Sequence, residues 1–383
     1  MKDKPNYCSY VEKGIRVKLF DTPSGLSAYV VPCCHITNMY IPSNFKKAYK
    51  VSTAEDVMNN ETLLFFKNYF NNHDNMPEAC IACINQEDKG LQSPRQRVNR
   101  KNYDQYDIST IDVVLGNSCN LACPFCSSHA SSLIDKLSRK LNASARPESW
   151  YPLTNYNARG SAQTTDVVAD ILSKYKVHTL KLIGGEPFLK ENWDKIATVI
   201  DSGVCNDMHL EVTTNGTILN DDIFKKLSKT KSAHLRISVD SIDDNYEFIR
   251  WPHNWNKMHK NLKYLRENNF DNIHVSVSNL VNIFNFEFLP EIEAYFSDVK
   301  NVVGYSTEIK PITHLMNYQN LPEHIINNVR KNIKRESLKQ AITKGNNNYS
   351  KEVIKREFDV LLAQRKMKAE NVIGPMTREW LGL

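Results

Sequence analysis

Short apolar runs alternate with segments of helical periodicity through the middle of the chain, between residues 106 and 310. The runs that predict strands are residues 111–115, 177–183, 209–213, 234–239, 273–277 and 302–305. The segments that predict helices are residues 128–141, 164–175, 193–200, 221–227, with Asn220 as its N-cap, 253–265 and 288–296. Strands that alternate with helices form a parallel sheet, because each helix returns the chain to the same end of the sheet. The pattern therefore predicts an α/β fold with helices outside the sheet and functional groups at the C-terminal ends of its strands.

Three cysteines follow the first predicted strand within one loop. Cys119, Cys123 and Cys126 have the spacing C-x3-C-x2-C. Cysteine thiolate is the usual ligand of iron-sulfur clusters, so a loop of this kind can fold around one cluster. Three thiolates leave one iron of a four-iron cube open to bind another molecule. A zinc site is the alternative, and His129 is the residue that could supply its fourth ligand.

The full pattern of this loop, C-x3-C-x-aromatic-C with Phe125 as the aromatic residue, resembles the signature of the radical S-adenosylmethionine (SAM) enzymes. The resemblance implies a [4Fe-4S] cluster on the three cysteines, with SAM chelated to the open iron and cleaved to methionine and a 5'-deoxyadenosyl radical. It implies an open partial TIM barrel of six βα units over residues 106–310. It also implies an electron donor such as flavodoxin or ferredoxin.

A second motif follows the second predicted strand. Gly184, Gly185 and Glu186 resemble the family's motif that holds the SAM amino group. Two residues without side chains let a ligand approach the backbone, and the glutamate adds a negative acceptor near an ammonium group. A Gly-Gly turn between strand and helix is the alternative. Polar residues at the next two strand ends are candidate contacts to the methionyl group or ribose of SAM, namely Asn215, Ser238 and Asp240, with an Asn-Gly turn and a helix-capping aspartate as alternatives.

Five further cysteines lie in the first hundred residues: Cys8, Cys33, Cys34, Cys80 and Cys83. A turn, a predicted strand over residues 27–31, a Cys-Cys pair, an amphipathic helix over residues 63–69 and a C-x2-C pair resemble the N-terminal twitch domain of some radical SAM proteins. A twitch domain is a shortened SPASM domain that holds one auxiliary iron-sulfur cluster. The resemblance implies that residues 1–105 form a small cysteine-rich domain, in which Cys80, Cys83, one of Cys33 and Cys34, and also Cys8 bind a second cluster. A zinc site built from the same residues is the alternative.

The last part of the chain, residues 311–383, leaves the alternation and predicts a C-terminal helical extension. Two helices are expected, over residues 323–343 and 351–368. From Leu321 to Leu383 there are 13 Lys and Arg residues against 7 Asp and Glu, an excess equal to the net charge of +6 of the whole chain. A basic helical tail is typical of binding to RNA, DNA or an acidic peptide, and a solvated helix face is the alternative.

Composition places the chain among ordinary globular proteins, with 41% hydrophobic and 24% charged residues. Neither a signal peptide nor an apolar run of about 18 residues is found, so we expect a cytoplasmic protein with no membrane contact and with reduced thiols. Two classes of function follow. The first is an enzyme that uses the radical on a peptide, protein or small molecule, or on RNA or DNA. The second is a non-catalytic zinc or iron-sulfur module that binds nucleic acid. This second class does not explain the Gly-Gly-Glu motif at a strand end.

Overall fold

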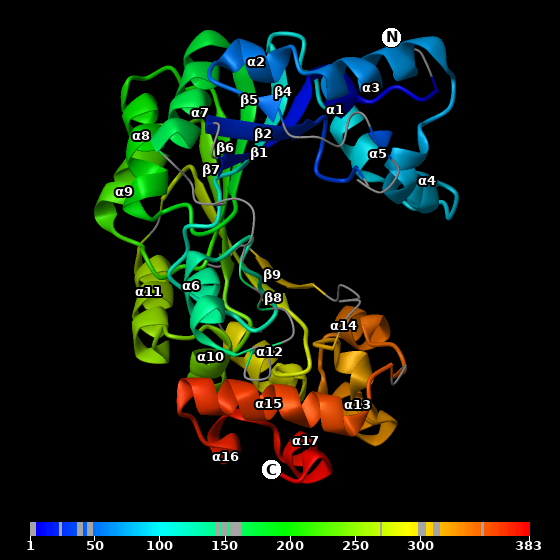
Figure 1. Ribbon diagram of the computed structural model, residues 1–383, viewed down its shortest axis with the longest axis vertical. Coiled ribbons are helices and arrows are strands. Elements are labelled where there is room, and N and C mark those ends of the chain that lie inside the picture. Colours follow the sequence, from blue (N-terminus) through cyan, green and yellow to red (C-terminus); the bar gives the residue numbers. More distant parts are fainter. Residues whose placement is uncertain are drawn as a thin grey trace. The chain divides into compact units, whose positions relative to one another are not determined.

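The computed structural model describes residues 5–22, 25–36, 41–43, 49–142, 146–147, 150, 152, 162–268, 270–297, 304–308, 315–345 and 348–383 (Figure 1). Its strands are β1 (Gly14–Thr22), β2 (Gly25–Val31), β3 (Tyr49–Lys50), β4 (Ile108–Val114), β5 (Val177–Ile183), β6 (His209–Thr214), β7 (Ser232–Ser238), β8 (Ile273–Leu280) and β9 (Gly304–Glu308). They form one sheet in the order β3-β2-β1-β4-β5-β6-β7-β8-β9. The pairs β1·β4, β4·β5, β5·β6 and β8·β9 are parallel, and β2 is antiparallel to β1 and β3. The predicted α/β class is therefore confirmed.

The chain divides into two compact units that are interleaved along the sequence. The first unit consists of Met1–Ser118, Thr154–Val212 and Asn220–His234. The second consists of Cys119–Leu153, Thr213–Leu219 and Leu235–Leu383. The three domains expected from the sequence, residues 1–105, 106–310 and 311–383, stay a prediction.

The first unit is built on strands whose two faces differ in polarity. On β4, β5 and β6 the side chains of Ile111, Leu180, Leu182 and Leu210 alternate with polar ones and are 0% exposed. Figure 1 shows α7 (Ala162–Lys174), α8 (Lys190–Asp201) and α9 (Asp221–Leu227) on one side of these strands. Period-two alternation against helices of this kind buries one face and leaves the other for polar groups.

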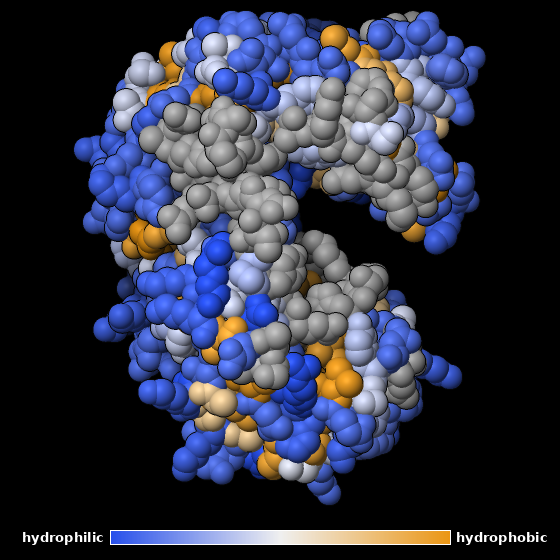
Figure 2. All heavy atoms as spheres, viewed as in Figure 1, coloured by the Kyte–Doolittle hydropathy of each residue, from blue (hydrophilic) through white to orange (hydrophobic). Residues whose placement is uncertain are grey.

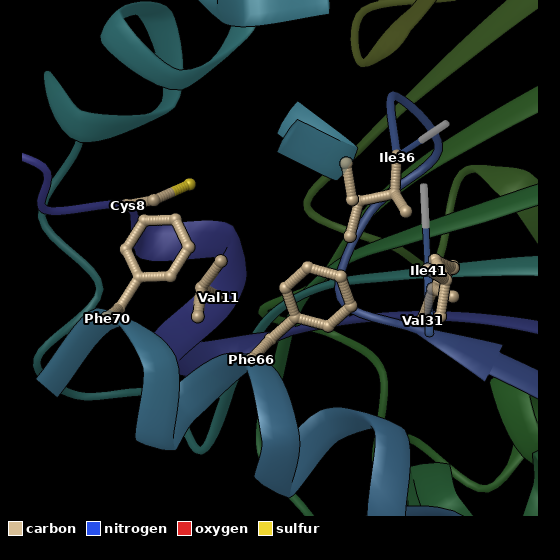
Figure 3. Close-up of a cluster of buried hydrophobic side chains, with 8 residues drawn as sticks. Cys8, Val11, Val31, Ile36, Ile41, Phe66 and Phe70 are labelled. Carbon is tan, nitrogen blue, oxygen red and sulfur yellow. The ribbon is translucent and has the colours of Figure 1, made fainter. Parts of the chain in front are cut away.

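Part of the N-terminal segment of the first unit packs around a small apolar core. Its helices are α1 (Ser9–Lys13), α2 (Ala54–Met58), α3 (Glu61–Asn72), η3 (Glu78–Cys80), α4 (Ile81–Glu87) and α5 (Pro94–Asn99), of which α1, α3 and η3 contribute to that core. Figure 3 shows Cys8 and Val11 beside Phe66 and Phe70, which project from one face of α3. The strand β1, which was not expected from the sequence, joins this segment to the sheet through its pairing with β4.

The second unit contains α6 (Ser132–Lys140), α10 (Asp243–Ile249), α11 (Trp255–Glu267), η5 (Phe286–Phe288), α12 (Leu289–Ser297), η6 (Tyr318–Asn320), α13 (Glu323–Asn332), α14 (Glu336–Ala341), α15 (Lys351–Arg365), α16 (Ala369–Val372) and α17 (Pro375–Leu381). The helix expected over residues 323–343 is broken into α13 and α14. The break occurs because the carboxylate of Glu293 accepts hydrogen bonds from the backbone N–H groups of Lys334 and Arg335.

No helix in the part of the chain that the structure describes is both long enough and apolar enough to span a membrane. Figure 2 shows mostly hydrophilic residues on the face viewed, with small hydrophobic patches between them.

Candidate active site

The loop that carries Cys119, Cys123 and Cys126 is held by hydrogen bonds inside the second unit. The backbone N–H of Cys119 donates to the Ser132 Oγ atom at 3.2 Å, and that of Cys126 donates to the Cys123 carbonyl at 3.0 Å. The N–H of Ala122 donates to the Trp251 carbonyl at 2.8 Å. The loop is therefore fixed both to the start of α6 and to the segment after α10.

The thiol of Cys126 lies close enough to those of Cys119 and Cys123 to be affected by both. Burial raises the pKa of Cys126 to about 12, and the neighbouring thiols of Cys123 and Cys119 contribute to this rise. Burial likewise raises the pKa of Cys123. A bound metal cluster reverses this effect, because thiols lose their protons when they become ligands. Three soft sulfur donors on one loop fit the three-cysteine ligand set of a [4Fe-4S] cluster.

Among the described residues, no three His, Cys, Asp or Glu side chains are grouped closely enough to hold a single metal ion. A four-iron cube holds its thiolates farther apart than one ion does, so this observation concerns single-ion sites.

Asn215, a predicted SAM contact, lies against the cysteine loop. Its Nδ2 atom is 3.9 Å from the Cys119 sulfur and donates a hydrogen bond to Asn120 Oδ1 at 2.8 Å. Its Oδ1 atom accepts from the backbone N–H of Thr217 at 3.0 Å. Asn215 therefore supports the loop beside the first thiol, and its role in binding SAM stays a prediction.

A buried arginine lies beside the second thiol. Arg250 is 8% exposed, and its Nη1 atom donates to the Cys123 sulfur at 3.7 Å. Its Nη2 atom forms an ion pair with Asp240, and its guanidinium carbon lies 5.7 Å from the centre of the Phe125 ring. Burial acts to lower the pKa of Arg250, but the nearby Asp240, Cys123 and Tyr246 together outweigh it, so the pKa is raised and the guanidinium stays protonated. Arg250 was not predicted from the sequence, because α10, the helix before it, was not expected.

Asp240, predicted as a ribose contact, is 1% exposed and has a left-handed backbone, with φ of 66°. Its Oδ1 atom accepts from the backbone N–H of Leu280 at 2.8 Å, and its carbonyl accepts from Asn279 and Asn285. These bonds and the ion pair with Arg250 give Asp240 a positioning role. Ser238 is the last residue of β7 and is half-buried.

A second buried arginine comes from the C-terminal helices. Arg365 of α15 is 6% exposed and donates to the carbonyl of Ala122 at 3.0 Å and to that of Phe248. Burial lowers its pKa to about 9. The sequence contained a signal for this residue, because Arg365 continues the helical stripe of Ile354, Phe358 and Leu361.

The Gly-Gly-Glu motif lies in the first unit, directly after β5. Gly184 and Gly185 have φ of 84° and 55°, and a Cβ atom on Gly185 would lie 2.2 Å from the Ser118 carbonyl oxygen. Both glycines are therefore required by the backbone. Glu186 is 0% exposed, its N–H donates to the Ser118 carbonyl at 2.7 Å, and its Oε1 atom accepts from the N–H of Phe188 at 3.1 Å. The motif thus fixes the backbone that leads into the cysteine loop.

Four of the five N-terminal cysteines line one small cavity in the first unit, namely Cys8, Cys33, Cys80 and Cys83. Burial raises the pKa of Cys8 to about 11 and also raises those of Cys33 and Cys80, and neighbouring thiols add to each shift. Cys34 is exposed and its thiol lies against Asp112 instead. The structure therefore separates Cys33 from Cys34 and brings Cys8 into the group. Four thiols suit either an iron-sulfur cluster or zinc by ligand type.

Arg95 lines the same cavity and holds its walls together. Its Nη1 atom donates to the carbonyls of Pro5 and Tyr7 at 3.0 and 2.9 Å, and its Nε atom donates to Glu87 Oε1 at 3.0 Å. Arg95 therefore ties the segment before Cys8 to the helix that carries Cys83.

Comparison with known proteins bears on the cysteine loop. Residues 113–295 match the model of the radical SAM superfamily. The chain contains a radical SAM domain. The cofactors that the radical SAM family uses are a [4Fe-4S] cluster and SAM.

Two curated proteins that the chain matches are probable GTP 3',8-cyclases. That of Aeropyrum pernix is 27% identical over 143 residues, which is 37% of this chain and 35% of the relative. That of Methanocella arvoryzae is 27% identical over 146 residues, which is 37% of this chain and 38% of the relative. The chain thus spans less than two fifths of the length of these relatives.

Two solved structures resemble the chain at low overall similarity. The structure of native anSMEcpe with bound AdoMet has a TM-score of 0.40 and 16% identity, and the match covers 58% of this chain and 59% of that one. The Streptococcus suis SuiB structure bound to S-adenosylmethionine has a TM-score of 0.36 and 13% identity, with coverage of 91% and 70%.

Proposed function

We propose that the protein reductively cleaves SAM and uses the resulting 5'-deoxyadenosyl radical to abstract hydrogen from a substrate. The observation that carries the proposal is a loop within the matched radical SAM domain in which the thiols of Cys119 and Cys123 lie near that of Cys126. When bound, the cluster and SAM supply the radical, and an electron donor such as flavodoxin or ferredoxin supplies the electron.

The proposed function assigns roles to several residues of the chain. Cys119, Cys123 and Cys126 would hold the cluster, while Arg250 and Asn215 keep two of these sulfurs in place. Backbone groups of Gly184 and Gly185 and the carboxylate of Glu186 would accept the SAM amino group. That carboxylate accepts a hydrogen bond from Phe188 and has further acceptor sites. Phe125, Ser238 and Asp240 stay proposed SAM contacts.

We propose that the N-terminal cysteines hold a second, auxiliary iron-sulfur cluster of the twitch type. The shared cavity of Cys8, Cys33, Cys80 and Cys83 supports it. The positive charge of Arg95 acts on the thiols of Cys8 and Cys80, so it would favour their ionised, ligating forms.

The substrate that we favour is a peptide, a protein or a small molecule, and the reaction is expected in the cytoplasm without a membrane. The match to probable GTP 3',8-cyclases adds weight to a small molecule. RNA or DNA is the alternative substrate. The basic tail gives that alternative limited support, since several of its cations are paired, as Lys355 is with Asp359.

The test of SAM cleavage uses cysteine variants of the full-length protein, reconstituted with iron and sulfide without oxygen. Replacing Cys119, Cys123 and Cys126 by Ala is expected to abolish 5'-deoxyadenosine formation under dithionite, because no thiolate remains for the cluster. Cys205→Ala is the matched control, since Cys205 is buried but belongs to neither cysteine group. Cleavage that survives in the triple variant would contradict the proposal.

A further inference from the structure

A row of alternating charges crosses the first unit on the face opposite to its apolar residues. Strand register places Arg16 of β1 beside Asp112 of β4, Asp112 beside Lys181 of β5, and Lys181 beside Glu211 of β6. Arg16 Nη1 lies 2.8 Å from Asp112 Oδ2, and Lys181 Nζ lies 2.8 Å from Glu211 Oε2. We call these four residues the charged row.

The charged row is only partly withdrawn from water. The side chains of Lys181 and Glu211 are 28% and 43% exposed, and that of Arg16 is 29% exposed. Charged side chains on a sheet face are costly to bury, and they are retained where water or a ligand can reach them. The opposite face already supplies the apolar packing, with Leu180, Leu182 and Leu210 at 0% exposure.

Lys18 extends the charged row by one cation that has no counterion among the described residues. It lies two residues after Arg16 on β1 and therefore points to the same face. The side chain of Lys18 makes no hydrogen bond or ion pair with any residue that the structure describes. Burial, with a smaller effect of Arg16, lowers its pKa. Together with the charged row it gives three cations and two anions, so one positive charge is uncompensated.

The place of Lys18 connects it to both cofactor sites of the first unit. Its register partner on β4 is Val114, whose side chain lies closest to the position where Gly184 would carry a Cβ atom. Within the charged row, Asp112 meets the thiol of Cys34, and the charges of Lys181 and Asp112 act on His35, which lines the cavity of the four cysteines. Lys18 and the charged row therefore have neighbours at both the Gly-Gly-Glu motif and the proposed auxiliary site.

We propose that Lys18 and the charged row recognise an anionic group of the substrate, a carboxylate or a phosphate. The inference rests on the proposed function, because it assigns the substrate of that reaction to this sheet face. An anion at Lys18 would replace the missing counterion and would sit beside the motif proposed to hold SAM. A charge-assisted hydrogen bond of this kind is stronger than a neutral one.

The first test measures the acylation rate of each lysine by mass spectrometry in the reconstituted, unreduced protein. The two probes are GTP for phosphate and hexaglutamate for carboxylate. We expect at least one probe to slow acylation of Lys18 and to leave Lys190, an exposed lysine of α8, unchanged. If Lys18 is protected by neither probe, or is slowed no more than Lys190, the proposal is overturned.

The second test measures the affinity of the protecting probe by titration calorimetry. Lys18→Met is expected to weaken binding about tenfold, and Lys18→Arg to retain most of the affinity, because a charge-assisted hydrogen bond contributes about that factor. Equal affinity in Lys18→Met would overturn the proposal, and the labelling result stands by itself if that variant does not fold.

Deoxyadenosine formation is assayed in the same wild-type preparation. Protection without SAM cleavage would refute only the proposed function, and cleavage without protection would refute only the role of Lys18.

Discussion

Cys33 and Cys34 are neighbours in the chain with different surroundings. The Cys33 thiol faces the cavity shared with Cys8, Cys80 and Cys83, whereas the Cys34 thiol faces Asp112. Substitutions of these two adjacent cysteines can therefore be compared directly, one inside the cavity and one outside it. The sequence could not choose between them, because successive residues of an extended segment point in opposite directions and the register was unknown.

We predict that Cys33→Ala lowers the iron bound after reconstitution by up to about four atoms per chain, the content of one [4Fe-4S] cluster. Cys34→Ala is expected to keep the wild-type iron content, since its thiol lies outside the cavity. Iron and protein are measured on the same samples, with the visible absorbance of the cluster as a second measure. An equal loss in both variants would show that the assignment of Cys33 is wrong.

At the scale of elements, α15 connects the C-terminal extension to the cysteine loop. Phe358 packs on Phe284 with ring centres 4.8 Å apart, and Arg365 donates to Ala122 and Phe248. The helix therefore stabilises the loop although Arg365 and Ala122 are 243 residues apart in the sequence. This role explains one arginine of the basic tail without any nucleic acid.

We predict that Arg365→Met destabilises the apoprotein by about 2 kcal/mol, because two backbone carbonyls near the loop lose a charged donor. The loss of a buried positive charge should also make the midpoint potential of the loop's cluster more negative. Thermal unfolding and an electron paramagnetic resonance titration measure the two effects. Arg356→Met on the exposed face of the same helix is the control, and an identical response of both variants would exclude a specific role for Arg365.

Elements with strong local signals were predicted well from the sequence. β5 and α9 have the bounds expected for them, and Asn220 caps α9 by accepting from the N–H of Ile223. Elements set by distant partners were not. β1 exists through its pairing with β2 and β4, and the break between α13 and α14 depends on Glu293, 41 residues before Lys334.

At the scale of the whole molecule, the role of charged residues also could not be predicted from the sequence alone. The tail's excess of cations was visible in the sequence, but its use was not. Arg365 is buried and stabilises the cysteine loop, and Arg335 lies beside Glu293. The charged row could not be predicted from the sequence for a related reason. Asp112, Lys181 and Glu211 belong to three strands, and only the register aligns them. The cysteine motifs, by contrast, were local and were found directly.

The two cysteine groups predict how iron is distributed over the whole chain. The loop supplies three thiols and the cavity four, and the groups share no residue. If each holds a [4Fe-4S] cluster, the reconstituted wild-type protein should contain about eight irons, and removal of either set should leave about four. Iron and zinc are measured together by mass spectrometry in the wild type, in the triple loop variant and in a Cys80→Ala/Cys83→Ala variant. About four irons with one zinc in the wild type, and loss of that zinc in the Cys80/Cys83 variant, would identify the N-terminal site as zinc. The loop would then remain the chain's single iron-sulfur centre, because its three thiols lack the fourth cysteine of a closed zinc site.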